Sequence, residues 1–100
     1  SEIKSLNVKV DQINDRQIAY ETQTNEDKMD ACRSRILRFG DECRRDMKHS
    51  REFFDQILED ITRYERYCDV HPEYENSKAV LTIEKIKKIY NKCDEDDSFL

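Results

Sequence analysis

The chain has 100 residues, of which 41% are Asp, Glu, Lys or Arg and only 36% are apolar. One glycine and one proline supply almost no turn chemistry, so the composition argues against a many-stranded sandwich or barrel. A charged, glycine-poor composition is typical of long helices, and we expect an all-α fold. Because a small domain with few apolar residues builds a marginal core, we also expect oligomerisation.

The net charge of −5 is concentrated near the end of the chain. Residues 94–97 supply four of these negative charges, and the remainder of the chain carries −1. The acidity is therefore a property of this segment. Generic binding to duplex DNA through net positive charge is disfavoured.

Apolar residues in the first 28 residues follow the alternating spacing of three and four that is typical of a coiled coil. We expect 1–28 to form a stalk, and Ile13 at a d position leaves dimer, trimer and tetramer open. The alternative is an amphipathic helix that packs on its own domain. The predicted oligomer seam contains Ile3, Leu6, Val10, Ile13, Gln17 and Tyr20, with Thr24 next in the series.

The spacing then changes phase, because continuing the first seam would bring Asp27 and Ser34 inward. We therefore predict a compact helical part over 29–93. Gly40 lies inside the new series and indicates either a kink or the close approach of another backbone. The new apolar series contains Met29, Cys32, Ile36, Phe39, Cys43 and Met47.

Two further helices are expected. Ser50 is a suitable N-cap for the first of them, Pro72 interrupts helix in the 69–76 loop, and Asn76 or Ser77 could cap the last helix. We expect 94–100 to be an acidic flexible tail in which Phe99 and Leu100 could dock. The two predicted apolar faces contain Phe53, Phe54, Ile57, Leu58, Ile61, Tyr64, Tyr67 and Cys68, and then Ala79, Val80, Ile83, Ile86, Ile89, Tyr90 and Cys93.

The cysteine and histidine pattern does not predict a metal, a cofactor or catalysis. The four cysteines fall at or near apolar helical positions, which favours reduced, buried thiols. Cys32 and Cys43 lie three helical turns apart, about 16 Å, so they cannot bind one zinc ion from a straight helix. Cys68 and His71 flank the loop, but we interpret them as a core residue and a loop residue and expect no enzyme activity.

A basic stretch over 33–51 carries +4, and the following stretch over 52–60 carries −4. We favour complementary charge across an antiparallel helix pair, with an anionic ligand as the alternative. The candidate anion or nucleic-acid contacts are Arg33, Arg35, Arg38, Arg44 and Arg45. The tyrosines Tyr64, Tyr67 and Tyr74 are expected at a core edge, with base stacking as the alternative.

Four segments at helix boundaries carry a resemblance: Cys32-Arg-Ser-Arg-Ile-Leu-Arg38, Ser50-Arg-Glu-Phe-Phe-Asp55, Tyr64-Glu-Arg-Tyr67 and His71-Pro-Glu-Tyr-Glu-Asn76. They resemble a group of small bacteriophage-encoded helical proteins, some of them holin-like or minor structural. The resemblance implies an all-α protein with a coiled coil or membrane span before the bundle. The chain departs from that group by having Tyr-Glu-Asn for Gly-Gly-Asn before the last helix and by lacking the span, which counts against membrane permeation.

Together these patterns predict an N-terminal coiled-coil helix followed by a small three-helix bundle. The predicted function is that of a non-enzymatic oligomeric scaffold or interaction protein, with itself and an unknown protein as partners. The alternatives are a nucleic-acid-associated regulator that uses the basic stretch, or an inhibitor of a host protein. We expect a cytoplasmic location, with membrane association only through a segment upstream of Ser1.

Overall fold

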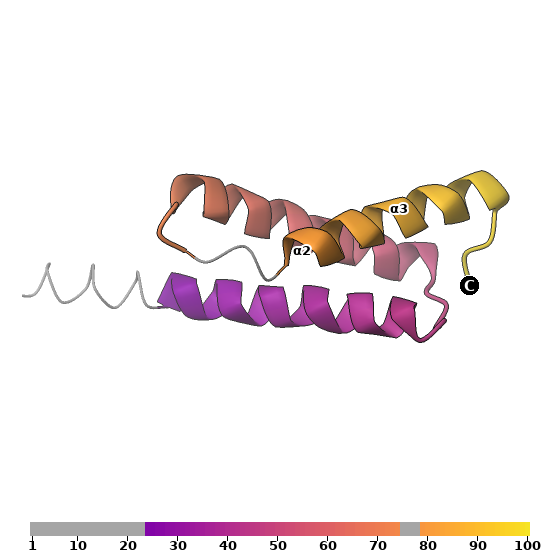
Figure 1. Ribbon diagram of the computed structural model, residues 1–100, viewed down its shortest axis with the longest axis horizontal. Coiled ribbons are helices and arrows are strands. Elements are labelled where there is room, and N and C mark those ends of the chain that lie inside the picture. The colour runs from indigo at the N-terminus through magenta and orange to yellow at the C-terminus, as the bar shows by residue number, and fades with distance from the viewer. Residues whose placement is uncertain (1–23, 75–78) are drawn as a thin grey trace, which may run out of the picture.

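The computed structural model describes residues 24–74 and 79–100. Within these ranges the chain is all-α and contains no strand, which confirms the all-α part of the prediction. Residues 24–44 are helical, and they are followed by α2 (Arg51–Val70) and α3 (Val80–Asp96). Figure 1 shows α2 running back along the 24–44 helix and α3 returning in the original direction.

Some sequence predictions fall outside the described residues. The seam residues from Ile3 to Tyr20 and the two candidate caps, Asn76 and Ser77, all lie there. Where α3 begins, Ala79 occupies the N-cap position without a side-chain hydrogen bond. The helices in the described ranges lack the combination of length and apolar character that crossing a membrane requires.

The 24–44 helix ends earlier than its apolar spacing predicts. Asp46 adopts a left-handed backbone conformation with φ of 62°, and the Met47 N–H donates to the Glu42 carbonyl at 3.0 Å. This arrangement satisfies carbonyls at the helix end and turns the chain away. Met47, which was predicted on the apolar face, is consequently 51% exposed.

Local side-chain and backbone contacts set both ends of α2. The Ser50 hydroxyl accepts a hydrogen bond from the Phe53 N–H at 3.2 Å, which confirms the predicted N-cap. At the other end, the His71 N–H donates to the Tyr67 carbonyl and Pro72 follows immediately. Proline disfavours helical backbone at the preceding residue, so α2 ends there.

The end of the described chain is more ordered than the flexible tail predicted over 94–100. The first three residues of that segment belong to α3, which ends where Asp97 turns left-handed. The Phe99 ring then packs against Phe54 at 5.5 Å between centroids, and the Leu100 N–H donates to the His49 carbonyl at 3.0 Å. Phe99 thus docks through its ring, whereas Leu100 is held through its backbone N–H and is 77% exposed.

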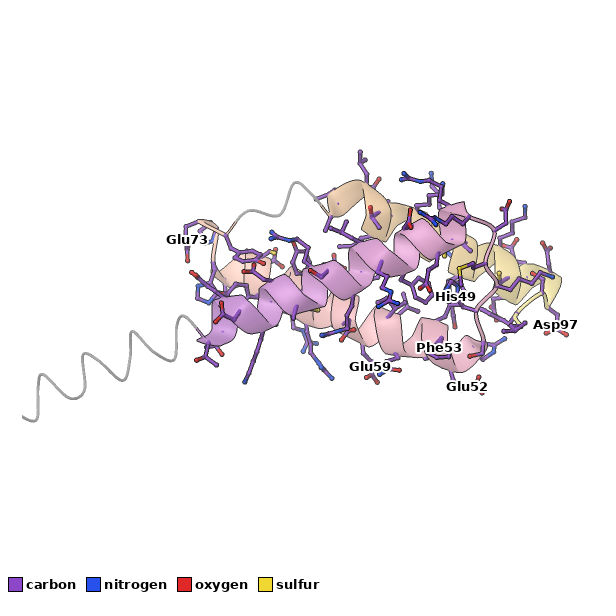
Figure 2. All side chains as sticks on the ribbon, turned by 90° about the horizontal axis from the view of Figure 1, so that it is seen from below. His49, Glu52, Phe53, Glu59, Glu73 and Asp97 are labelled. Atoms are coloured by element: carbon purple, nitrogen blue, oxygen red, sulfur yellow. The ribbon has the colours of Figure 1, made fainter. Side chains whose placement is uncertain are left out.

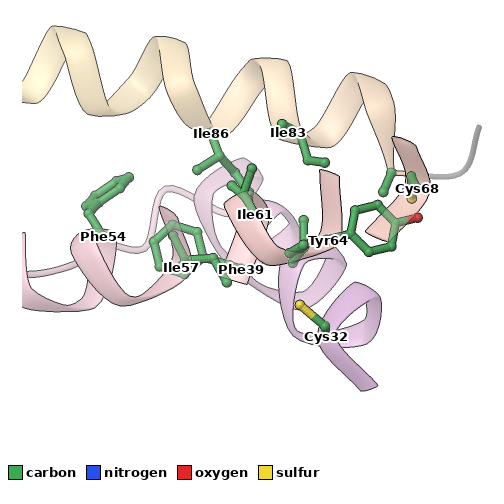
Figure 3. Packing of buried hydrophobic residues seen from close by; sticks show 11 residues of the cluster. Cys32, Phe39, Phe54, Ile57, Ile61, Tyr64, Cys68, Ile83 and Ile86 are labelled. Carbon is green, nitrogen blue, oxygen red and sulfur yellow. The ribbon is translucent and has the colours of Figure 1, made fainter. Parts of the chain in front are cut away.

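A single hydrophobic core lies between the helices (Figure 3). Each helix contributes residues at its own three-and-four spacing, which is why the faces fit together. Complete burial of an isoleucine contributes roughly 1.5–3 kcal/mol relative to exposure. The buried core residues are Cys32, Ile36, Phe39, Phe54, Ile57, Ile61, Tyr64, Cys68, Ala79, Ile83 and Ile86.

At Gly40 the 24–44 helix comes close to side chains of α3. A Cβ atom built at this position would clash with the Thr82 Cγ2 atom and would touch the Ile86 side chain. The residues on both sides of Gly40 are helical. The atoms that come close to Gly40 belong to the Thr82 and Ile86 side chains and not to another backbone, which was the predicted form of the close approach. Glycine is less favourable than alanine in a helix interior. It is accommodated here because Thr82 leaves room for a hydrogen atom only.

A double-mutant cycle at this contact tests the packing. We expect Gly40→Ala to lower the free energy of unfolding by about 1–2 kcal/mol, because the added methyl overpacks the contact. In a Thr82→Ala background the clashing methyl is gone, and Gly40→Ala should then stabilise by about 1 kcal/mol through helix propensity. Urea denaturation of the four proteins measures both effects. A change of the same sign and size in both backgrounds would contradict the close approach.

Candidate functional site

The basic residues predicted as anion contacts do not form one surface. At 3.6 residues per turn, Arg33 and Arg44 fall on one flank of the 24–44 helix and Arg35 falls on the other. Arg38 lies close to the face opposite the core, and Arg45 follows the end of the helix. The buried face separates the two flanks. A phosphate backbone needs cations gathered along one track, so this distribution does not favour a nucleic-acid interface.

Arg35 instead joins two helices. Its Nε and Nη2 atoms donate to the two carboxylate oxygens of Asp60 on α2, at 3.0 and 3.4 Å. The Asp60 side chain is only 12% exposed, and its backbone carbonyl accepts the Cys32 thiol at 3.2 Å. A bidentate arginine compensates a poorly solvated carboxylate better than a single contact does. Arg35 and Asp60 are therefore structural.

The remaining charges pair mostly within one helix. Arg45 pairs with Asp41 four residues earlier, and Arg33 lies 3.5 Å from Asp30. Among the described residues, no ion pair holds Arg38 or Arg44. The predicted charge complementarity between 33–51 and 52–60 is thus realised through Asp60, while Arg51 pairs with Asp94 on α3 at 3.0 Å.

The three tyrosines pack together, but Tyr64 lies inside the core and not at its edge, where it was predicted. Tyr64 is fully buried, and the Tyr74 ring meets both Tyr64 and Tyr67 edge to face. The Tyr74 hydroxyl donates to the Asp30 carboxylate at 2.6 Å, and burial together with this bond raises the Tyr74 pKa. The cluster closes the gap between the start of the described helix and the end of α2. It leaves no open aromatic face on Tyr64 for stacking.

Cys68 and His71 do not form a nucleophile and base pair in the described structure. Cys68 is buried, and burial raises its pKa. The His71 Nδ1 atom faces Glu73 at 3.2 Å, and its ring packs on Tyr67. The described residues also contain no group of three or more His, Cys, Asp or Glu side chains arranged to bind a metal ion.

A cavity that the sequence did not predict lies at the end of the bundle where the 24–44 helix stops. Its volume is about 390 Å³, and we call it the end cavity. Figure 2 shows His49 at this end of the molecule. The lining residues are Cys43, Asp46, Met47, Lys48, His49, Phe54, Ile89, Lys92, Cys93 and Ser98.

Aromatic packing fixes the imidazole of His49 beside this cavity. The ring stacks on Phe39 at 4.0 Å between centroids and meets Phe54 edge-on at 5.7 Å, and its side chain is 9% exposed. Its Nδ1 atom lies 3.9 Å from the Cys43 Sγ atom. Its Nε2 atom lies 3.5 Å from the Glu42 Oε1 atom and makes no hydrogen bond within the described residues.

The end cavity shows what sequence reasoning missed. Cys43 and His49 are six residues apart, so their pairing had a weak local signal. Cys93 joins them only because α3 returns to the same end of the bundle. The position of His49 beside the cavity could not be predicted from the sequence, because a residue in a connection between helices follows no periodic spacing.

The exposed face of the 24–44 helix is a second feature of interest. Asp27, Ala31 and Ser34 continue the spacing of the predicted seam, and all three are exposed. Their mean direction lies about 150° around the helix axis from the buried face. The residues that continue the seam therefore lie on the side of the helix away from the hydrophobic core.

Comparison with known proteins gives no match to a protein-family model, a curated protein or a solved structure. The resemblance to phage-encoded helical proteins therefore stays a prediction.

Removal of the Arg35 side chain tests its structural role. We expect Arg35→Ala to lower the free energy of unfolding by about 1–2 kcal/mol, because Asp60 would lose its cross-helix partner. The loss is not larger because Arg35 is half-exposed, so solvent screens the ion pair. Arg38→Ala on the same helix is the matched control, with an expected change below about 0.5 kcal/mol. Thermal and urea unfolding measure both, and equal losses would contradict the assignment.

Proposed function

We propose that the protein is a self-associating scaffold or interaction protein whose seam over 1–28 joins copies of the chain. The observation that carries this proposal is the separation of two helix faces. Cys32, Ile36 and Phe39 are buried in the bundle, whereas Asp27 and Ser34, which continue the seam spacing, are exposed. Association through the seam would therefore leave the bundle contacts unchanged.

The sequence supplies the chemistry for association. The predicted seam is apolar at Ile3, Leu6, Val10 and Ile13, and exposure of these side chains to water is unfavourable. The continuation beyond residue 24 is polar or small, so the proposed seam ends where the bundle begins. Association at one end leaves the other end of each bundle free.

The bundle would then act as the displayed part. Phe53 is 62% exposed, and it borders a groove of about 260 Å³ between the 24–44 helix and α2. Figure 2 shows Phe53 on the outer side of the bundle. Several copies displayed together strengthen a weak contact through effective concentration. This supports an interaction role in which the partner binds the bundle.

Light scattering of the full chain tests the proposal. Wild type should be a dimer to tetramer, and Leu6→Asn with Ile13→Asn should shift it to monomer. Each lost apolar contact costs about 2–3 kcal/mol, which weakens association by roughly 30- to 150-fold. Circular dichroism should show that the monomeric variant keeps its bundle helices.

The matched control is Gln12→Asn, which lies outside the seam positions and should keep the wild-type mass. A monomeric wild type at high micromolar concentration would overturn the proposal. So would a loss of mass in the control as large as that in the seam variant.

A further inference from the structure

The end cavity brings together two thiols from different helices. Cys43 lies in the last turn of the 24–44 helix and Cys93 in the last turn of α3, and both line the cavity. Both are free and only partly buried, whereas Cys32 and Cys68 are free and buried in the core. A reagent that enters the cavity therefore meets two of the four thiols.

His49 provides Cys43 with a proton acceptor. The Glu42 carboxylate, 3.5 Å from Nε2, favours the imidazole tautomer that carries its proton on Nε2. The Nδ1 atom is then unprotonated and faces the Cys43 Sγ atom at 3.9 Å. A thiol beside a base of this kind can deprotonate within the site. Stacking on Phe39 keeps the ring in this position.

The charges around the cavity favour binding of an anionic ligand. Lys48 and Lys92 line it, and within the described residues no ion pair holds either of them. Asp46 also lines the cavity, so the local balance is one net positive charge. A cationic rim raises the local concentration of small anions. The volume of about 390 Å³ falls in the range of small-molecule sites.

From these observations we propose that the end cavity is a thiol–disulfide exchange site for a low-molecular-weight anionic disulfide, with Cys43 as the attacking thiol and Cys93 as the resolving thiol. Cys43 gives its proton to His49 Nδ1, and the thiolate attacks one sulfur of the small disulfide. The S–S bond of that molecule breaks, and one half leaves as a thiolate that takes up a proton.

The second step closes the cycle. The Cys93 thiolate attacks the Cys43 sulfur of the mixed disulfide, which breaks and releases the other half of the small molecule as a thiol. The protein loses two electrons and two protons, and the small disulfide gains both. The product is a Cys43–Cys93 bond between the last turns of two helices. A bridge that closes a long loop restricts the unfolded chain, so the oxidised protein should unfold at a higher temperature.

The reaction should be slow at neutral pH and faster in base. Burial is the main cause that raises the Cys43 pKa; Glu42 and Cys93 add to this rise and Lys85 opposes it. A raised pKa leaves little thiolate at pH 7. The rate should therefore rise with pH between about pH 7 and pH 8.5.

Intact-mass spectrometry of the full chain with oxidised glutathione tests the proposal. Wild type should lose the mass of two hydrogens, and a peptide map should show Cys43 joined to Cys93. Cys93→Ser should stop at one glutathione adduct on Cys43, and Cys43→Ser should react at least about tenfold more slowly. Cys32→Ser is the matched control and should behave like wild type.

A second arm tests the charged rim. Wild type should react faster with oxidised glutathione than with cystamine, a cationic disulfide of the same reactive group. Lys48→Glu with Lys92→Glu should reverse that order. Adducts spread evenly over the four cysteines, a wild type that stays as a mixed disulfide, or a wild-type preference for cystamine would each overturn the proposal.

Discussion

The burial of one face of the 24–44 helix against α2 and α3 is the constraint on which the rest of the structure depends. That face must accept α3 at the distance allowed by Gly40 and Thr82 and must place Arg35 beside Asp60. Both contacts fix the rotation of the helix about its axis. The same rotation turns the continuation of the seam toward solvent, which is the basis of the proposed self-association.

The rotation also explains why the basic residues make a poor anion surface. Cations on both flanks of one buried face cannot gather, and Arg35 is used for packing. The end cavity follows from the same arrangement, because parallel passage of the 24–44 helix and α3 brings Cys43 and Cys93 to one end. Charge and thiol chemistry are thus consequences of helix packing, and neither was specified by a local motif.

Local sequence patterns predicted the helices better than they predicted side-chain exposure and contacts between helices. The Ser50 cap and the change of phase before Met29 were visible in the sequence because both depend on neighbours within a few residues. The exposure of Phe53 was not visible, since it lies at the edge of an apolar face and packing selected Phe54 instead. The end of the 24–44 helix depends on the left-handed backbone conformation of Asp46, a residue other than glycine, and no sequence pattern predicted it. The end cavity could not be predicted either, because it forms only when α3 returns to the end of the bundle that holds Cys43 and His49.

Hydrogen–deuterium exchange at increasing protein concentration separates the bundle face from the proposed seam. Backbone amides exchange more slowly where association protects them. If copies associate through the seam, concentration-dependent protection should be confined to residues upstream of about 28, while α2 and α3 exchange at unchanged rates. Protection that changes in α2 or α3 with concentration, or that never changes upstream, would contradict association through the seam.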